Sequence, residues 1–190
     1  MKYIDDVLSE IEQDHSVTRG QAFSKLRALG MNDFASVLWN MPDGRFPRAS
    51  SILPTMSSED VQRLWTGFYG YSLLSQSISF MRAIAANYAD ITGNSLSGKR
   101  ILDYGMGYGR LLRLAAFYSD EVYGVDPWPE SIRQCEEAGL PNVALSDYLP
   151  VSLPVPVDVD FSYAFSVFTH LSEKATIAAL TAVHRHTRAG

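Results

Sequence analysis

The sequence has little cysteine, and this scarcity excludes two classes of site. Cys135 is the one cysteine among 190 residues, so the chain holds no internal disulfide and no zinc site built from cysteines. We expect its thiol to pack inside the protein as a small apolar group.

Long apolar runs and clusters of basic residues are also scarce. The most apolar long stretch, residues 71–91, is interrupted by serines, a glutamine and an arginine, so it predicts no membrane-spanning helix. The first ten residues carry acids where a signal peptide needs a basic start and an apolar core, and we therefore expect a cytoplasmic protein. A formal charge of −5 without a basic stripe argues against a nucleic-acid partner.

The remaining composition is that of an ordinary globular protein. Hydrophobic residues make up 46% and charged residues 19%, and the length suits one domain, alone or with a small appendage. Residues 1–95 repeat apolar residues at helical spacing, as Ile4, Val7, Leu8 and Ile11 do. This spacing predicts an all-helical N-terminal region.

From Lys99 onward, short β-rich runs alternate with helical ones. We predict strands at 99–103, 121–126, 142–146 and 158–165, and helices at about 109–118, 129–138 and 172–188. This βαβαβ pattern predicts an α/β fold, with a Rossmann-like parallel sheet and right-handed crossovers, over residues 96–190.

The stretch ILDYGMGYGR places Gly105, Gly107 and Gly109 at alternate positions after the first predicted strand. A glycine-rich turn between a strand and a helix brings backbone close to a ligand, whereas a plain turn needs one or two glycines. A dinucleotide site requires G-x-G-x-x-G, but Arg110 stands where the third glycine belongs. Asp103 would repel a pyrophosphate and attract a cationic amino group. The loop therefore favours a nucleoside with an amino-acid end, and an NAD-dependent oxidoreductase is the weaker interpretation.

The second motif is VYGVDP, an apolar run that ends in Asp126, 21 residues after Gly105. One βαβ step gives such a separation, and a carboxylate can accept two hydroxyl donors at once. Asp126 is therefore a candidate for binding a ribose, with a plain helix N-cap as the alternative. Pro127 and Trp128 follow it, and the indole ring of Trp128 either covers a purine or packs as an ordinary core aromatic.

In this order, the motifs of residues 99–190 resemble those of the class I S-adenosylmethionine-dependent methyltransferases. The resemblance implies that the D-x-G-x-G-x-G loop binds S-adenosylmethionine and that Asp126 holds both ribose hydroxyls. It also implies that Asp147, in ALSDYLP, accepts from the adenine amino group and that Tyr148 lies beside the ring. A turn aspartate is the alternative for Asp147. In DFSYAFSVFTHL, which resembles the family's fourth strand and following turn, Ser162 replaces a usually aliphatic residue; we expect this to alter packing more than chemistry.

The same resemblance implies methyl transfer to a small-molecule or glycan acceptor. The Asn-Pro-Pro-Tyr motif of the amide and base N-methyltransferases is replaced by Ala-Phe-Ser-Val, which favours an oxygen, carbon or small-molecule acceptor, and of these we expect oxygen. Phe165, in this run, is a candidate cofactor contact. His170 is the candidate general base, expected one turn into the helix after the fourth strand, although a histidine there is often structural. We see no carboxylate cluster for a catalytic metal after that strand.

Aromatic residues near two glycines make the N-terminal region a candidate lid and acceptor platform. They lie in LWTGFYGYSLLSQS and include Trp65, Tyr69 and Tyr71. Mobile glycines and amphipathic aromatics suit a segment that folds over a ligand. Alternatively, these rings seal the helix over residues 71–91 onto the sheet, because aromatics at helical spacing are usually core residues.

The predicted strand order is 3-2-1-4, and strands five to seven of the family fold have no counterpart in the 190 residues. We expect a longer parent chain, a partner or second copy that covers the edge of the fourth strand, or a lineage that has lost those strands. The alternative function is accordingly a non-catalytic subunit that binds S-adenosylmethionine or pairs with an active one.

Overall fold

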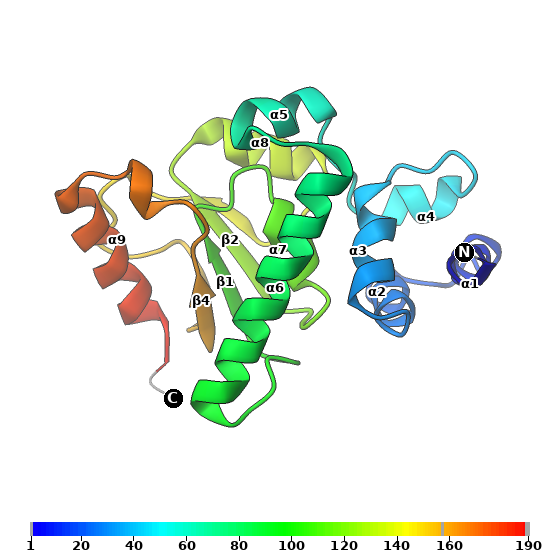
Figure 1. The fold of residues 1–190 in the computed structure, drawn as a ribbon, viewed down its shortest axis with the longest axis horizontal. Coiled ribbons are helices and arrows are strands. Elements are labelled where there is room, and N and C mark those ends of the chain that lie inside the picture. The colour runs from blue at the N-terminus through cyan, green and yellow to red at the C-terminus, as the bar shows by residue number, and fades with distance from the viewer. Residues whose placement is uncertain (1, 157, 189–190) are drawn as a thin grey trace. The chain divides into compact units, whose positions relative to one another are not determined.

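The computed structural model of the chain describes residues 2–156 and 158–188 (Figure 1). It divides into two compact units, Met1–Ala83 and Ile84–Gly190, which we call the first and second units. The division falls inside the long helix α6 (Gly70–Thr92). None of the described helices is both long and apolar enough to cross a membrane.

The first unit consists of helices joined by loops, with no strand among its described residues. Its helices are α1 (Lys2–Gln13), α2 (Arg19–Arg27), α3 (Met31–Trp39), α4 (Pro47–Ile52), α5 (Glu59–Thr66) and the N-terminal part of α6. Capping sets their limits: the Thr18 hydroxyl accepts from Gln21 N–H at the start of α2, and Gly67 ends α5 at φ +77°. Ile11, Leu26 and Phe34 are fully buried, so the predicted apolar faces form the core.

The second unit is built on a four-stranded parallel sheet. Its strands are β1 (Ile101–Tyr104), β2 (Val122–Asp126), β3 (Val143–Leu145) and β4 (Phe161–Tyr163), in the order β3-β2-β1-β4. The predicted strand order and the Rossmann-like fold class are therefore confirmed. Between and after the strands come α7 (Arg110–Ala115), α8 (Pro129–Glu137), the 3-10 helix η1 (Phe168–His170) and α9 (Glu173–His186).

Helices cover both faces of this sheet (Figure 1). On one face, Leu102 and Val125 share a buried cluster with Ala179 and Ala182 of α9. On the other face, a Cβ added to Gly124 would lie 3.0 Å from Leu112 of α7, so glycine lets this helix approach the sheet closely. Burial on both faces explains why the strands read as apolar runs rather than as alternating patterns.

The fourth strand is shorter than predicted, and a backbone bridge flanks it. Regular pairing with β1 covers Phe161–Tyr163 rather than 158–165, whereas Val159 forms a parallel bridge with Thr187. Helix α9 ends before this bridge, because the Val159 N–H donates to the carbonyl of His186 over 2.8 Å. Ser162, the residue that departs from the family pattern, shares a 2.7 Å hydrogen bond with the Thr187 hydroxyl. Its polarity therefore has a packing explanation.

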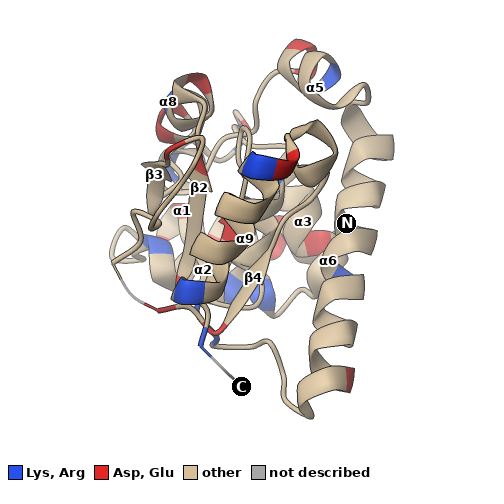
Figure 2. Cartoon of the chain, turned by 90° about the vertical axis from the view of Figure 1, so that its left-hand side faces the viewer, with Lys and Arg blue, Asp and Glu red and all other residues tan. Residues whose placement is uncertain are grey.

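Charged residues flank β4 and α9 (Figure 2). Asp160, which precedes β4, accepts from the backbone N–H of Arg100 over 2.8 Å and lies 3.8 Å from the guanidinium of Arg188. The charges of α9 stand at its two ends, and its middle turns carry the half-exposed apolar side chains of Ile177 and Leu180.

Candidate functional site

The glycine-rich loop between β1 and α7 has a left-handed backbone at each of its three glycines. The φ angles of Gly105, Gly107 and Gly109 are +74°, +57° and +75°. An L-residue with a side chain rarely adopts such values, because its Cβ then approaches the following carbonyl oxygen. The alternation of glycines in the sequence is thus a requirement of the loop's path.

Two of these glycines also make room for side chains of the protein itself. A Cβ at Gly105 would lie 2.5 Å from Cγ2 of Val167, and one at Gly109 would lie 2.2 Å from Cδ1 of Leu140. Both distances are far below van der Waals contact. The close approach that the sequence suggested for a ligand is therefore used, at these positions, for packing. The case for a ligand rests on the polar groups around the loop.

A buried arginine holds the loop from inside, and the sequence analysis missed it. Arg113 of α7 is fully buried; its Nε donates to the carbonyl of Gly109 and its terminal nitrogen to the carbonyl of Tyr108, each over 3.1 Å. Burial lowers the pKa of this guanidinium to about 10. The available signal was an arginine among leucines and alanines in a helix that should be apolar on all sides.

Asp103 on β1, two residues before Gly105, has a buried carboxyl group. The side chain is 2% exposed, and among the described residues its Oδ2 atom has no hydrogen-bond partner. Burial raises the pKa of this carboxyl to about 7, although the Tyr163 hydroxyl and the Arg110 guanidinium act in the opposite direction. A buried acceptor without a donor suits a cationic N–H group, as the sequence predicted for this acid.

Asp126, at the end of β2, joins the glycine loop to the start of the next helix. Its Oδ2 accepts the backbone N–H of Gly107 over 3.0 Å, and its Oδ1 accepts that of Trp128 over 2.9 Å. The alternative of a plain helix N-cap is wrong, because the N-cap of α8 is Trp128. Each carboxylate oxygen has a second lone pair, so Asp126 can accept further donors from a diol.

Two buried hydroxyls extend this polar site, and sequence reasoning missed both. Ser146, just after β3, donates its backbone N–H to the carbonyl of Asp126 over 3.0 Å. Its Oγ and that of Ser131, in the first turn of α8, are buried without a hydrogen-bond partner among the described residues. Serines in such positions usually look like turn or cap residues in a sequence, so no pattern identifies them.

Arg110 and Phe165 come together although they are 55 residues apart in the sequence. The guanidinium carbon of Arg110 lies 4.9 Å from the centroid of the Phe165 ring, a cation–π distance. Burial lowers the pKa of Arg110, whereas Tyr108 and Asp103 act to raise it. Arg110, whose presence argued against a dinucleotide loop, is therefore a cation that interacts with the carboxyl group of Asp103.

Other predicted site residues lie on the loops that follow β2 and β3. Pro127 is half-buried, Trp128 is 47% exposed, Asp147 is exposed and Tyr148 is 66% exposed. Exposed rings and an exposed carboxylate beside the end of the sheet are accessible to a ligand. Their individual roles stay predictions.

His170 is not one turn into a helix, as the sequence predicted. It ends the 3-10 helix η1, is exposed, and donates its backbone N–H to the carbonyl of Val167 over 3.0 Å. Helix α9 starts only at Glu173, because the Ser172 hydroxyl caps it by accepting the N–H of Ala175 over 3.2 Å.

The aromatic residues proposed as a lid belong to the first unit. Tyr69 is 43% exposed and Tyr71 is 83% exposed, and the guanidinium of Arg63 lies 4.2 Å from the centroid of the Tyr69 ring. Trp65 is half-buried on α5. Their action as a lid stays a prediction. The described residues contain no group of three or more histidine, cysteine, aspartate or glutamate side chains that could hold a metal ion.

Comparisons with known proteins find similarity to methyltransferases. The family model described as "Methyltransferase domain" matches residues 101–190. CalS10, an S-adenosylmethionine-bound amino pentose methyltransferase from Micromonospora echinaspora, superposes with a TM-score of 0.53 at 21% identity, covering 72% of this chain and 55% of its own. DesVI from Streptomyces venezuelae also gives 0.53, at 13% identity, covering 70% of this chain and 54% of its own.

The chain thus spans just over half the length of these two structures. A search of the curated proteins gave no match. The family match and the β3-β2-β1-β4 sheet agree with each other and with the glycine loop on which the sequence interpretation depended. Residues 101–190 therefore match the methyltransferase-domain model, and the chain shares a Rossmann-like fold with CalS10.

Proposed function

We propose that the protein is an S-adenosylmethionine-dependent methyltransferase that acts on an oxygen of a small-molecule or glycan acceptor. One observation carries the proposal: two acids flank the glycine loop. Asp103, just before the loop, has a buried Oδ2 without a hydrogen-bond partner among the described residues, and Asp126 accepts the backbone N–H of Gly107 within the loop. These two acids fit the two polar ends of the cofactor, an amino-acid ammonium group and a ribose diol. When bound, the cofactor would supply a reactive methyl group on its sulfonium sulfur.

Different residues of the second unit would then bind different parts of the cofactor. Asp103, in its ionised form, attracts the ammonium group, while Asp126 accepts from the ribose hydroxyls without giving up its two backbone donors. Asp147, Tyr148, Trp128 and Pro127 would surround the adenine. His170 is the proposed proton acceptor, and its exposed position leaves its imidazole open to a substrate hydroxyl.

Calorimetric titration of S-adenosylhomocysteine into the 190-residue chain tests the proposal, with NADH as the control ligand. Micromolar binding of the nucleoside without binding of NADH is the expected result. Binding of NADH alone by a folded chain would overturn it. Release of S-adenosylhomocysteine in the presence of an acceptor then separates an enzyme from a subunit that only binds the cofactor. An amino sugar belongs among the acceptors tested, because CalS10 is an amino pentose methyltransferase.

The titration of Asp103 gives this binding a predicted pH dependence. Its pKa is raised to about 7, so its ionised fraction increases about threefold between about pH 6.5 and 7.5. Because the ionised form attracts the ammonium group, the Kd for S-adenosylhomocysteine should fall about threefold over that interval. The contribution of Asp103 to the free energy of unfolding has the opposite trend. It is fully present below the pKa of the unfolded chain, near 3.8, and is lost as the pH rises through the folded value of about 7.

Calorimetry at the two pH values measures this change, and Asp103→Asn is the variant to compare. The amide cannot titrate, so its affinity should be weaker and equal at both values. An identical threefold change in the variant would assign the pH dependence to another group.

A further inference from the structure

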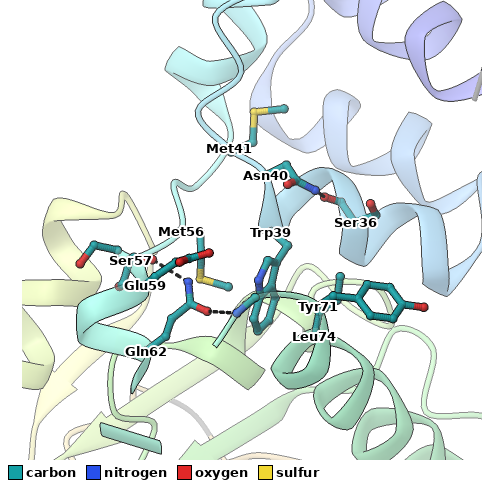
Figure 3. A pocket seen from close by; sticks show the side chains of 12 residues that line it. Ser36, Trp39, Asn40, Met41, Met56, Ser57, Glu59, Gln62, Tyr71 and Leu74 are labelled. Atoms are coloured by element: carbon teal, nitrogen blue, oxygen red, sulfur yellow. Dashed lines mark hydrogen bonds between the residues drawn. The ribbon is translucent and has the colours of Figure 1, made fainter. Parts of the chain in front are cut away.

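The first unit contains a cavity of about 470 Å³, formed by the end of α3, the segments on either side of α4, the start of α5 and the start of α6 (Figure 3). This volume is in the range of sites that enclose small molecules. Its lining is Ser36, Trp39, Asn40, Met41, Met56, Ser57, Ser58, Glu59, Gln62, Gly70, Tyr71 and Leu74. All of these residues belong to the first unit, and none of them belongs to the glycine loop.

Trp39 provides a hydrogen-bond donor without an acceptor. Its side chain is 8% exposed, and its indole Nε1 is buried with no hydrogen-bond partner among the described residues. An unpaired buried donor costs about 1–3 kcal/mol. Figure 3 shows the indole in the middle of the lining, between Met56 and Gln62 on one side and Leu74 on the other. A ligand oxygen in the cavity would satisfy this N–H.

Neighbouring polar groups are already engaged and hold the wall in place. The side-chain amide of Gln62 donates to the carbonyl of Ser57 over 2.9 Å and accepts the N–H of Gly70 over 3.1 Å. The amide nitrogen of Asn40 donates to the carbonyl of Ser36 over 2.7 Å. The two Gln62 bonds connect α5 to the preceding segment and to the start of α6, and the Asn40 bond holds the end of α3, so the cavity has a defined shape.

The charge of the lining selects the kind of ligand. Glu59 is acidic, and no lysine, arginine or histidine is among the lining residues. A phosphate or carboxylate ligand would be repelled, whereas an ammonium group would be attracted. Apolar contact comes from Met41, Met56 and Leu74, which suits the carbon skeleton of a compact molecule.

We propose that this cavity binds a small hydroxylated amine, with its ammonium group beside Glu59 and an oxygen accepting from the indole N–H of Trp39. This site is additional to the proposed methyl transfer, and its existence does not depend on that activity. None of the proposed cofactor residues lines the cavity, so titration with S-adenosylhomocysteine should give the same affinity whether or not the cavity is altered.

The probe for this site is glucosamine, and glucose and glucose 6-phosphate are its neutral and anionic counterparts. The chain has three tryptophans, so its ¹H–¹⁵N spectrum shows three indole resonances, and Trp39→Phe assigns the one of interest. Glucosamine should move that resonance in a saturable manner, while the other two sugars bind more weakly. If glucosamine leaves the Trp39 resonance in place, or if glucose 6-phosphate binds as well as glucosamine, the proposal is wrong.

Two substitutions on the same helix provide a matched comparison. Glu59→Gln removes the charge from the lining and should weaken glucosamine binding about fivefold. Asp60→Asn removes an equal charge from the next residue, which does not line the cavity, and should leave the affinity unchanged. If both variants weaken glucosamine binding equally, the attraction comes from the general negative charge of the surface, and the assigned site is wrong.

Trp39→Phe tests the donor and the folding of the unit together. Glucosamine affinity should fall about threefold to tenfold, because the indole hydrogen bond is lost. Stability should change little, since the substitution also removes an unpaired buried N–H. Unaltered affinity in a folded variant would show that the indole does not contact the ligand.

Discussion

Replacing Gly109 by alanine should lower the free energy of unfolding of the second unit by roughly 2–5 kcal/mol. Two costs combine: a φ of +75° is unfavourable for an L-residue by about 1–2 kcal/mol, and the new Cβ would lie 2.2 Å from Leu140. The affected turn is the start of α7 and carries the candidate cofactor site, so binding of S-adenosylhomocysteine should weaken as well. Urea denaturation followed by circular dichroism measures the loss of stability.

Gly98→Ala separates the two costs. Gly98 has a similar φ of +71°, but a Cβ there would meet no atom within 4 Å. Its substitution should therefore show the backbone cost alone, about 1 kcal/mol. If the two alanine variants lose equal stability, Leu140 yields freely and the packing explanation for Gly109 is incorrect.

Replacing Asp126 by alanine should weaken S-adenosylhomocysteine binding tenfold or more, on the order of 1.4 kcal/mol. The substitution removes the proposed acceptor for the ribose hydroxyls. It also leaves the backbone N–H groups of Gly107 and Trp128 without their acceptor, so the loop itself becomes less well held. Calorimetry measures the affinity, and circular dichroism at the same temperature verifies that the variant is folded.

Glu136→Ala is the control for this experiment. Glu136 is an exposed acid on α8, so its removal changes the net charge equally without touching the loop. Its affinity should equal that of the parent chain. Wild-type affinity in a folded Asp126→Ala variant would remove Asp126 from the cofactor site.

The sequence predicted the sheet and its acids because both depend on local patterns. Apolar runs separated by helical periods predicted the parallel strands, the family resemblance supplied their order, and an acid at the end of each of two runs predicted Asp103 and Asp126. The predicted position of His170 inside a helix was wrong, also for a local reason. Ser172 caps α9, so this helix begins after the histidine. A cap and a 3-10 turn can each follow the same apolar strand, so periodicity cannot distinguish them.

Other parts of the site depend on tertiary packing, and local patterns reveal little of them. Arg113 stands among leucines and alanines, but only the folded unit shows that it is buried and donates to the carbonyls of the loop. The hydroxyls of Ser131 and Ser146 become unpaired only when the fold buries them. Trp39 is similar: its aromatic ring predicts a core position, but the missing partner of its N–H can be seen only in the folded unit.

The hydrogen bonds from Arg113 to the carbonyls of Tyr108 and Gly109 affect the free energy of ligand binding at the glycine loop. The loop's left-handed residues are fixed during folding by contacts with the protein, so their conformational entropy is lost before any ligand arrives. Association then requires little ordering of the backbone, and the free energy of each new hydrogen bond contributes to affinity rather than to shaping the loop. Ligand binding at this end of the sheet should resemble docking to a rigid surface, with small differences in amide exchange between the free and bound loop.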